Sequence, residues 1–270
     1  MTSLETLKAK AQWVRREMLK LHKNAPESRV ASCLSDIEIF VVLYYGGILS
    51  YNPQNPSAQD RDRFIISKGH GAVSLYPILA DLGFFEKEEL EKIGTENSFL
   101  RVIPDADVPG FETINGSLGH GLGVACGVAM ALKRKKQDQK VFVLCGDGEL
   151  NEGSVWEAVM FASYHKLNNL LLIVDNNKMS MLGYQKDILN LEPLEEKFSA
   201  FGWKTLNVDG HNIEQVHKTL STLKTNPSDQ PKILIADTRK GKGVSTLEND
   251  PLCHVKSLKP DEIDNILEGW

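Results

Sequence analysis

The sequence predicts an α/β protein built on a doubly wound, mostly parallel sheet that is flanked by helices. Two apolar runs rich in Val, Ile and Leu, at 141–145 and 170–174, are typical of buried parallel strands. The residues between them, 153–166, have the composition of a crossover helix, so the three segments together indicate a βαβ unit. Helices and strands alternate along the rest of the chain, and this alternation favours a parallel sheet.

Before this unit, local signals predict four helices and one strand. Apolar residues at helical spacing predict a helix over 4–25. The next helix, 35–45, is predicted to have Ser35 as its N-cap and Glu38 at its third position. A strand over 63–68 leads into a glycine-rich turn. The other two helices are predicted over 72–82 and 122–135.

After the unit, strands over 203–208 and 232–237 flank a predicted helix over 213–223. The residues beyond 258 can form one short helix. We find no internal repeat, low-complexity linker or break in composition. The sequence therefore predicts a single domain over residues 1–270 with a short C-terminal tail.

The composition limits the classes of function. With 41% hydrophobic and 25% charged residues, the 270-residue chain is typical of a soluble globular protein. Its net charge of -5 comes from interspersed acidic and basic residues, which gives no reason to expect nucleic acid or membrane binding. No apolar run could cross a bilayer, and the N-terminal residues lack the apolar core of a signal peptide. The cysteines are widely spaced without a CxxC pair, so we expect a reduced, cytoplasmic protein.

Polar residues follow both strands of the βαβ unit, Asp147 after the first and Asn177 after the second. Ligands of parallel sheets bind outside the carboxyl ends of the strands. One carboxylate and one amide oxygen suit a small hard cation that keeps its other coordination positions for phosphate oxygens. Gly146 and Gly148 let the backbone approach such phosphates without a Cβ in the way. The pattern predicts a site for a metal ion and a diphosphate.

These residues resemble a known signature. Gly-Asp-Gly at 146–148, followed about thirty residues later by Asn-Asn at 176–177, is similar to the thiamine diphosphate signature. Alone, the first half would be a turn after a strand and the second a loop, but the pair at this spacing favours cofactor binding. The surrounding residues, with those at 67–71, 113–121 and 240–249, are similar to transketolases.

The resemblance runs from the first helix to about His254, and it is to the N-terminal, diphosphate-binding half of a transketolase. That half also occurs as a separate small subunit. The resemblance implies the thiamine diphosphate-binding fold, and within it the domain that holds the diphosphate, called the PP domain.

The resemblance also implies roles for individual residues. Asp147, Asn177 and the backbone carbonyl of Met179 would hold Mg²⁺, or else Ca²⁺ or Mn²⁺. His70 and His254 would be the catalytic candidates, near the diphosphate and the thiazolium ring of the cofactor. The other expected cofactor contacts are Gly146 and Gly148 at the diphosphate, Gly116 and Leu118 with Ser117 between them at the aminopyrimidine ring, and Met181 under the bent cofactor.

Simpler alternatives exist for several of these residues. His70 stands between two glycines and could be a turn residue bonded to the backbone, and His254 has a weaker sequence context. Gly116 and Leu118 could equally be helix-entry residues. Glu152 and Glu157 resemble carboxylates at the dimer interface of the family, and the alternative is a solvated helix face. We assign no role to the histidines expected on helix surfaces or in loops, His22, His165, His211 and His217.

Two departures from the family pattern concern the substrate. Arg29 and Ile103 replace histidines that, in ordinary transketolases, contact the sugar and can pass protons. Arginine stays protonated and can grip phosphate or carboxylate, whereas isoleucine donates no hydrogen bond. We expect an altered substrate, either a less hydroxylated ketone or an unusual sugar acceptor. The alternative is that neighbouring residues supply the missing contacts.

The resemblance therefore implies a transferase subunit that moves a two-carbon ketol unit from a ketose to an aldehyde. In this family, a glutamate that protonates the aminopyrimidine lies on a pyrimidine-binding domain, and the residues after 249 are too few to form one. We expect an α2β2 assembly with a separate pyrimidine-binding subunit. The competing functions are a 2-oxo acid decarboxylase or dehydrogenase component and a non-catalytic cofactor-binding subunit.

Overall fold

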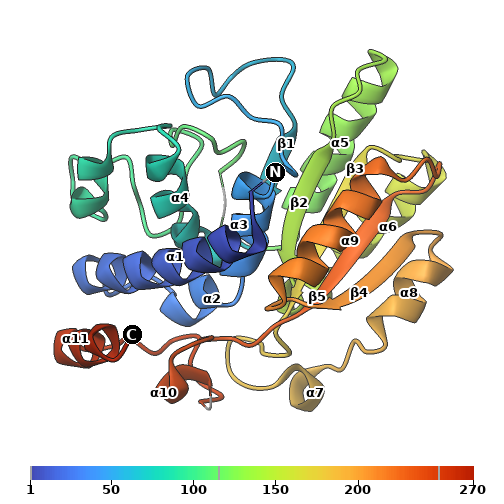
Figure 1. Cartoon of the computed structure of the whole chain (residues 1–270). Coiled ribbons are helices and arrows are strands. Elements are labelled where there is room, and N and C mark those ends of the chain that lie inside the picture. The colour runs from blue at the N-terminus through green and yellow to red at the C-terminus, as the bar shows by residue number, and fades with distance from the viewer. Residues whose placement is uncertain (1, 115, 249) are drawn as a thin grey trace.

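The computed structural model describes residues 2–114, 116–248 and 250–270; Asn115 and Asn249, which belong to two of the motifs, lie outside these ranges. The strands within them form one parallel sheet in the order β1-β2-β3-β5-β4 (Figure 1). The predicted fold class is confirmed. The strand bounds are β1 Arg63–Ile66, β2 Val141–Gly146, β3 Leu170–Asn176, β4 Lys204–Asp209 and β5 Lys232–Asp237.

Helices cover both faces of this sheet. On the first face lie α1 Leu4–Asn24, α2 Val30–Leu34, α3 Ile37–Tyr45, η1 Gly69–Leu75, α4 Tyr76–Asp81, α9 Ile213–Thr225 and α11 Pro260–Glu268. On the second face lie α5 Gly121–Arg134, α6 Gly153–Tyr164 and α8 Leu194–Ala200. The short helices are η2 Lys87–Lys92, η3 Gly148–Asn151, α7 Gln185–Ile188 and α10 Ser245–Glu248.

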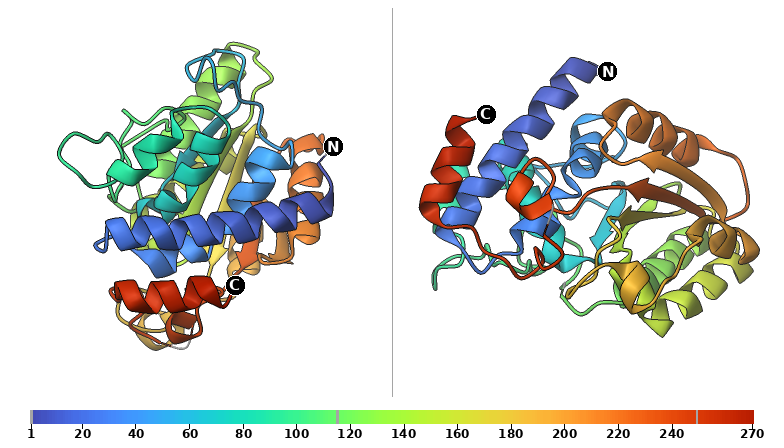
Figure 2. Two further views of the ribbon diagram at one scale, coloured as in Figure 1. Left: turned by 60° about the vertical axis from the view of Figure 1, so that its left-hand side comes forward. Right: turned by 90° about the horizontal axis from the view of Figure 1, so that it is seen from below.

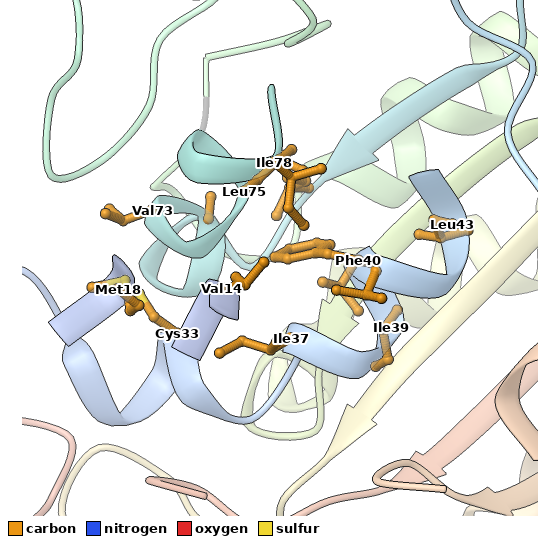
Figure 3. Close-up of a cluster of buried hydrophobic side chains, with 14 of the residues drawn as sticks. Val14, Met18, Cys33, Ile37, Ile39, Phe40, Leu43, Val73, Leu75 and Ile78 are labelled. Carbon is orange, nitrogen blue, oxygen red and sulfur yellow. The ribbon is translucent and has the colours of Figure 1, made fainter. Parts of the chain in front are cut away.

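Alternate residues of each central strand enter the two hydrophobic cores. Phe142 and Leu144 of β2 belong to the core under α1, α3 and α9, whereas Val143 belongs to the core under α5 and α6. In the first core, Val14 of α1 lies beside Phe40 of α3 (Figure 3). Burial on both faces explains why these strands are continuous apolar runs in the sequence.

The second predicted helix is shorter than expected because Ser35 has a tertiary partner. Ser35 keeps a helical backbone at the end of α2, and its hydroxyl donates to Asp175 at 2.7 Å instead of capping a helix. Asp36 is the N-cap of α3. Glu38 accepts a hydrogen bond from Arg15 at 2.8 Å, so the predicted start of this helix, with Ser35 as N-cap and Glu38 at the third position, is wrong.

Two other expectations need correction. The helix predicted over 72–82 is a 3-10 helix, η1, followed by the α-helix α4, in which Pro77 occupies a first-turn position that needs no N–H donor. His22 lies in the core and not on a helix surface. Its Nε2 accepts from the Leu258 N–H at 3.1 Å, and its Nδ1 lies 2.8 Å from the Ser28 hydroxyl.

The carboxyl ends of the strands lie at one edge of the sheet, and the C-terminal segment returns past them to α1. Asp147 follows β2, and its N–H donates to the Asp175 carbonyl of β3 at 3.2 Å, which places the two strand ends side by side. Figure 2 shows α11 alongside α1. Within the described ranges, we find no helix that is both long and apolar enough to cross a membrane.

Candidate active site

A cavity of about 160 Å³ lies at the carboxyl ends of the strands. It brings together residues from segments far apart in the sequence. The predicted site residues that line it are Gly146, Asp147, Gly148, Asn177 and Met179, together with His70, Leu118, Met181 and His254. The candidate metal, diphosphate and catalytic residues therefore meet in one place.

The Asp147 carboxylate is fixed by backbone donors. Its two oxygens accept from the N–H groups of Gly148 at 2.8 Å and Lys178 at 2.5 Å. Its backbone carbonyl accepts from the Gln185 amide at 3.1 Å. Burial, aided by the charge of Asp175, raises the pKa of Asp147 to about 7. A buried carboxylate with a raised pKa is a group that a bound cation would stabilise in its charged form.

Asn177 is oriented by its neighbours. Its Nδ2 donates to Asp175 at 3.0 Å, and its Oδ1 accepts from the Met179 N–H at 3.1 Å. A carbonyl oxygen has two lone pairs, so the Asn177 oxygen can accept one further contact. The Met179 carbonyl lies 3.4 Å from the Lys240 ammonium.

The donor set and the shape of this end of the cavity fit a hard cation with a diphosphate. A carboxylate, an amide oxygen and a backbone carbonyl are oxygen ligands of the kind that Mg²⁺ binds. A Cβ built on Gly146 or Gly148 would come no closer than 3.4 Å to any protein atom. Neither glycine is therefore required by close packing within the chain, and both line the cavity.

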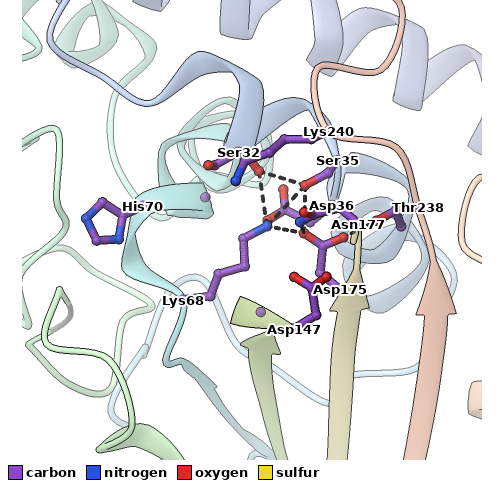
Figure 4. Close-up of polar contacts among 12 residues, drawn as sticks. Ser32, Ser35, Asp36, Lys68, His70, Asp147, Asp175, Asn177, Thr238 and Lys240 are labelled. Atoms are coloured by element: carbon purple, nitrogen blue, oxygen red, sulfur yellow. Dashed lines mark hydrogen bonds and ion pairs between the residues drawn. The ribbon is translucent and has the colours of Figure 1, made fainter. Parts of the chain in front are cut away.

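A buried ionic network lies beneath the strand ends (Figure 4). The Lys68 ammonium pairs with Asp175 and with Asp36 at 3.0 Å, and it donates to the Ser35 hydroxyl at 3.1 Å. Burial alone would lower the pKa of Lys68, but the two carboxylates outweigh it and raise the pKa. Asp175 also accepts from the Thr238 hydroxyl. The network joins the ends of β1, β3 and β5.

Two histidines lie together on another side of the cavity. The rings of His70 and His254 are 5.6 Å apart, and His254 Nδ1 is 3.3 Å from the Ser32 hydroxyl. Burial and the positive charge of Lys240 lower the pKa of His254 to about 3. Burial and the charge of Arg29 lower the pKa of His70. Both imidazoles are therefore neutral near pH 7.

The other predicted site residues do not line the cavity. Arg29 stands at the start of α2, where its charge reaches both histidines. Gly116 has a φ of +116°, and a Cβ there would lie 3.0 Å from Ile103. Ser117 lies beside it. The side chains of Glu152, at the N-cap of α6, and Glu157, within α6, are exposed.

Sequence reasoning missed five residues that line the cavity. They are Ser32, Lys68, Glu149, Ser180 and Lys240. Lys68 and Lys240 stand within the quoted motifs, and Glu149 directly follows the Gly-Asp-Gly motif; these motifs were interpreted through their glycines and histidines. Lys68 and Lys240 each precede a glycine and are both buried, and an ammonium is seldom buried without an anionic partner.

The chain is similar in sequence and fold to known proteins. Residues 22–270 match the model of the family described as transketolase, thiamine diphosphate binding domain. The chain is 40% identical over 268 residues to a protein of Actinobacillus succinogenes named as one subunit of an apulose-4-phosphate transketolase, covering 98% of this chain and 96% of that protein. It is 36% identical over 230 residues to a 6-deoxy-6-sulfo-D-fructose transketolase subunit of a Clostridium species, covering 85% and 83% of the two.

A solved structure agrees with the sequence matches. The crystal structure of transketolase from Campylobacter jejuni matches with a TM-score of 0.92 and 32% sequence identity. The match covers 99% of this chain and 43% of that one. This chain therefore spans less than half of that transketolase, but nearly the full length of the apulose-4-phosphate transketolase relative.

Proposed function

Because this chain belongs to the transketolase family, we propose that it is the thiamine diphosphate-binding subunit of a split transketolase that transfers a two-carbon ketol unit. The observation that supports this most directly is the meeting of Asp147, Asn177 and Met179 in one cavity at the strand ends. The relatives named as subunits support a division of the enzyme into two chains.

The oxygens of Asp147, Asn177 and the Met179 backbone would hold Mg²⁺, or Ca²⁺ or Mn²⁺ in its place. Lys240 lies beside them and supplies positive charge for the diphosphate. The rings of the cofactor would be bordered by the segment 116–118 and by Met181, that is, by Gly116, Ser117, Leu118 and Met181. Bound thiamine diphosphate supplies a nucleophilic carbon and an electron sink for cleaving the bond next to a carbonyl.

His70 and His254 are the proposed catalytic residues. Because burial keeps both rings neutral near pH 7, each ring has one nitrogen free to accept a proton from a substrate hydroxyl and one that can donate. The Ser32 hydroxyl beside His254 Nδ1 would leave Nε2 as the nitrogen available to the substrate.

The partner would be a pyrimidine-binding subunit in an α2β2 assembly, with this chain as a single PP domain over residues 1–270. Glu152 and Glu157 would lie at the interface. Their helix, α6, also exposes Met160, Phe161 and Tyr164, which are apolar side chains of the kind found in contacts between subunits. The four cysteines are buried free thiols, which fits a reducing, cytoplasmic location.

The substrate would differ from that of ordinary transketolases. Arg29 can grip an acidic group near the histidines, and Ile103 offers an apolar contact at 37% exposure. Two relatives are named for apulose-4-phosphate and for 6-deoxy-6-sulfo-D-fructose. We propose an unusual ketone or sugar with an acidic group, and efficient turnover of xylulose 5-phosphate with ribose 5-phosphate would contradict this.

Reconstitution tests the proposal. The chain is mixed with the pyrimidine-binding subunit encoded beside it, and glycolaldehyde transfer is measured with thiamine diphosphate and Mg²⁺. We expect transfer only when both chains are present, and transfer by the isolated chain would contradict the split. Release of CO₂ from a 2-oxo acid would favour a decarboxylase component. Cofactor binding by calorimetry without any turnover would favour a non-catalytic subunit.

A further inference from the structure

Glu149 is a buried carboxylate that the proposed function leaves without a role. Its residue is 2% exposed and lines the cavity. Its Oε1 accepts from the Gly119 N–H at 2.8 Å and from the Ser67 hydroxyl, and its Oε2 accepts from the Gly146 N–H at 3.2 Å. One carboxylate therefore joins the end of its own strand, at Gly146, to two segments that are distant in the sequence.

Ser67 extends this arrangement to the start of α5. Its hydroxyl donates to Glu149 and accepts from the Gly121 N–H at 3.0 Å. A Cβ built on Gly121 would lie 2.4 Å from the Ser67 Cβ, so the backbone of this segment approaches Ser67 closely. The Gly119 carbonyl accepts from the Ser154 hydroxyl at 2.9 Å. The N–H and the carbonyl of Gly119 therefore both bond to side chains that follow β2, those of Glu149 and Ser154.

These contacts lie between the two halves of the proposed cofactor site. Gly146 directly precedes Asp147, which would hold the metal and the diphosphate. Gly119 directly follows Leu118, which would border the aminopyrimidine ring. Because both glycine N–H groups bind the same carboxylate, the separation of the two halves is set by the Glu149 side chain.

We propose that Glu149, together with Ser67, is a positioning residue that joins the ring-binding segment 116–118 to the strand end that carries Asp147. This inference rests on the proposed function. Asp147 has its own backbone donors, Gly148 and Lys178, so the diphosphate half keeps its geometry when the link is broken. The ring-binding half would be displaced, and the affinity for the organic part of the cofactor would fall.

The test compares two ligands that share the diphosphate. Binding of thiamine diphosphate and of inorganic pyrophosphate, each with Mg²⁺, is measured by calorimetry on the chain co-purified with its partner subunit. In Glu149→Gln, one oxygen becomes an NH₂ group, so at least one of the three donors loses its acceptor. We expect affinity for thiamine diphosphate to fall about tenfold while affinity for pyrophosphate changes less than about twofold.

Ser67→Ala provides a second variant of smaller volume change. It removes the Glu149 and Gly121 contacts of the hydroxyl but leaves the Gly119 and Gly146 bonds to Glu149 intact. Because Ser67 holds the Glu149 carboxylate and the Gly121 N–H at the ring-binding side of the link, its loss loosens the link without breaking it. We expect the same selective loss, about threefold to tenfold, and a double variant no weaker than Glu149→Gln alone, because both changes act on one link. Glu196→Gln, on an exposed face of α8, is the matched control and should change neither affinity.

The outcomes separate this inference from the proposed function. Equal losses of affinity for both ligands in the variants would mean that Glu149 only stabilises the fold, and unchanged binding of thiamine diphosphate would mean that it positions nothing. Either result overturns the inference alone. A wild-type complex that binds neither ligand overturns the proposed function and the inference with it.

Discussion

The diphosphate end of the cavity and its mouth are built in different ways. At the diphosphate end, Asp147 and Asn177 leave adjacent strands, and their side chains are held by hydrogen bonds within the chain. At the mouth, by which we mean the exposed loop residues around Met181, that side chain lines the cavity and is 53% exposed; Ile103, on another loop, does not line the cavity and is 37% exposed. The comparison teaches that hydrogen bonds within the chain fix the side chains at one end of the cavity, whereas those at the mouth are exposed.

The largest effect is expected on stability, when the buried ionic network under the diphosphate end is broken. Lys68→Met leaves Asp175 and Asp36 buried without a counter-charge, so the free energy of unfolding should fall by about 3–5 kcal/mol in urea titrations. Lys8→Met, which breaks an exposed pair with Glu5, is the control and should cost less than about 1 kcal/mol. Similar losses in the two variants would contradict the view that this end is held by the buried network.

Next in size is the effect of removing Asp147, the proposed metal ligand. Asp147→Ala removes a carboxylate that faces the cavity, and affinity for thiamine diphosphate with Mg²⁺ should fall by about two to three orders of magnitude. Calorimetry on the assembled complex measures it. Asp138→Ala, at an exposed position, should leave the affinity unchanged. Retained affinity in Asp147→Ala would remove the basis of the proposed function.

The next effect concerns His22, a buried histidine of α1. His22 bonds Ser28, beside Arg29, and Leu258, near His254. Burial lowers the pKa of His22 from 6.5 to about 4, so the unfolded chain binds a proton more readily than the folded one. Its contribution to stability is complete above pH 6.5 and is lost as the pH falls towards about 4.

The fall of the His22 pKa from 6.5 to about 4 corresponds to about 3.5 kcal/mol in full, at about 1.4 kcal/mol per pKa unit, and about 2–3 kcal/mol of this is lost between pH 7 and pH 4.5. Urea titrations at pH 7 and pH 4.5 measure it in the wild-type chain and in His22→Gln. The variant should show a weaker pH dependence, whereas His165→Gln, at an exposed position, should behave as the wild type. An unchanged pH dependence in His22→Gln would assign the acid sensitivity to other groups.

The smallest effect is expected at Arg29, whose charge reaches the two cavity histidines. Arg29→His restores the histidine of ordinary transketolases, and kcat/KM for xylulose 5-phosphate with ribose 5-phosphate should rise about threefold to tenfold, the size of one added hydrogen bond. Arg29→Lys keeps the charge and should give no such gain. A fall in kcat/KM for Arg29→His would mean that arginine already serves the ordinary sugar phosphates.

The same contrast explains how much the sequence could predict. The strands and the residues that follow them are set by local apolar runs, so the fold class and the meeting of Asp147 with Asn177 could be predicted. The pairing of Lys68 with Asp175 joins residues 107 positions apart, and no local pattern reveals it. Ser35 has the sequence of an N-cap but bonds Asp175, because a buried carboxylate outweighs a local preference.

The loop beside Met181 has a practical consequence for anyone who prepares this protein. Leu182, Ile188 and Leu189 are 67%, 55% and 57% exposed, and they follow Met181 closely in the chain. Produced without the proposed partner subunit, the chain would expose these apolar side chains, which favour self-association and chaperone binding. Co-expression with that proposed subunit should raise the yield of monodisperse material more than any change of buffer.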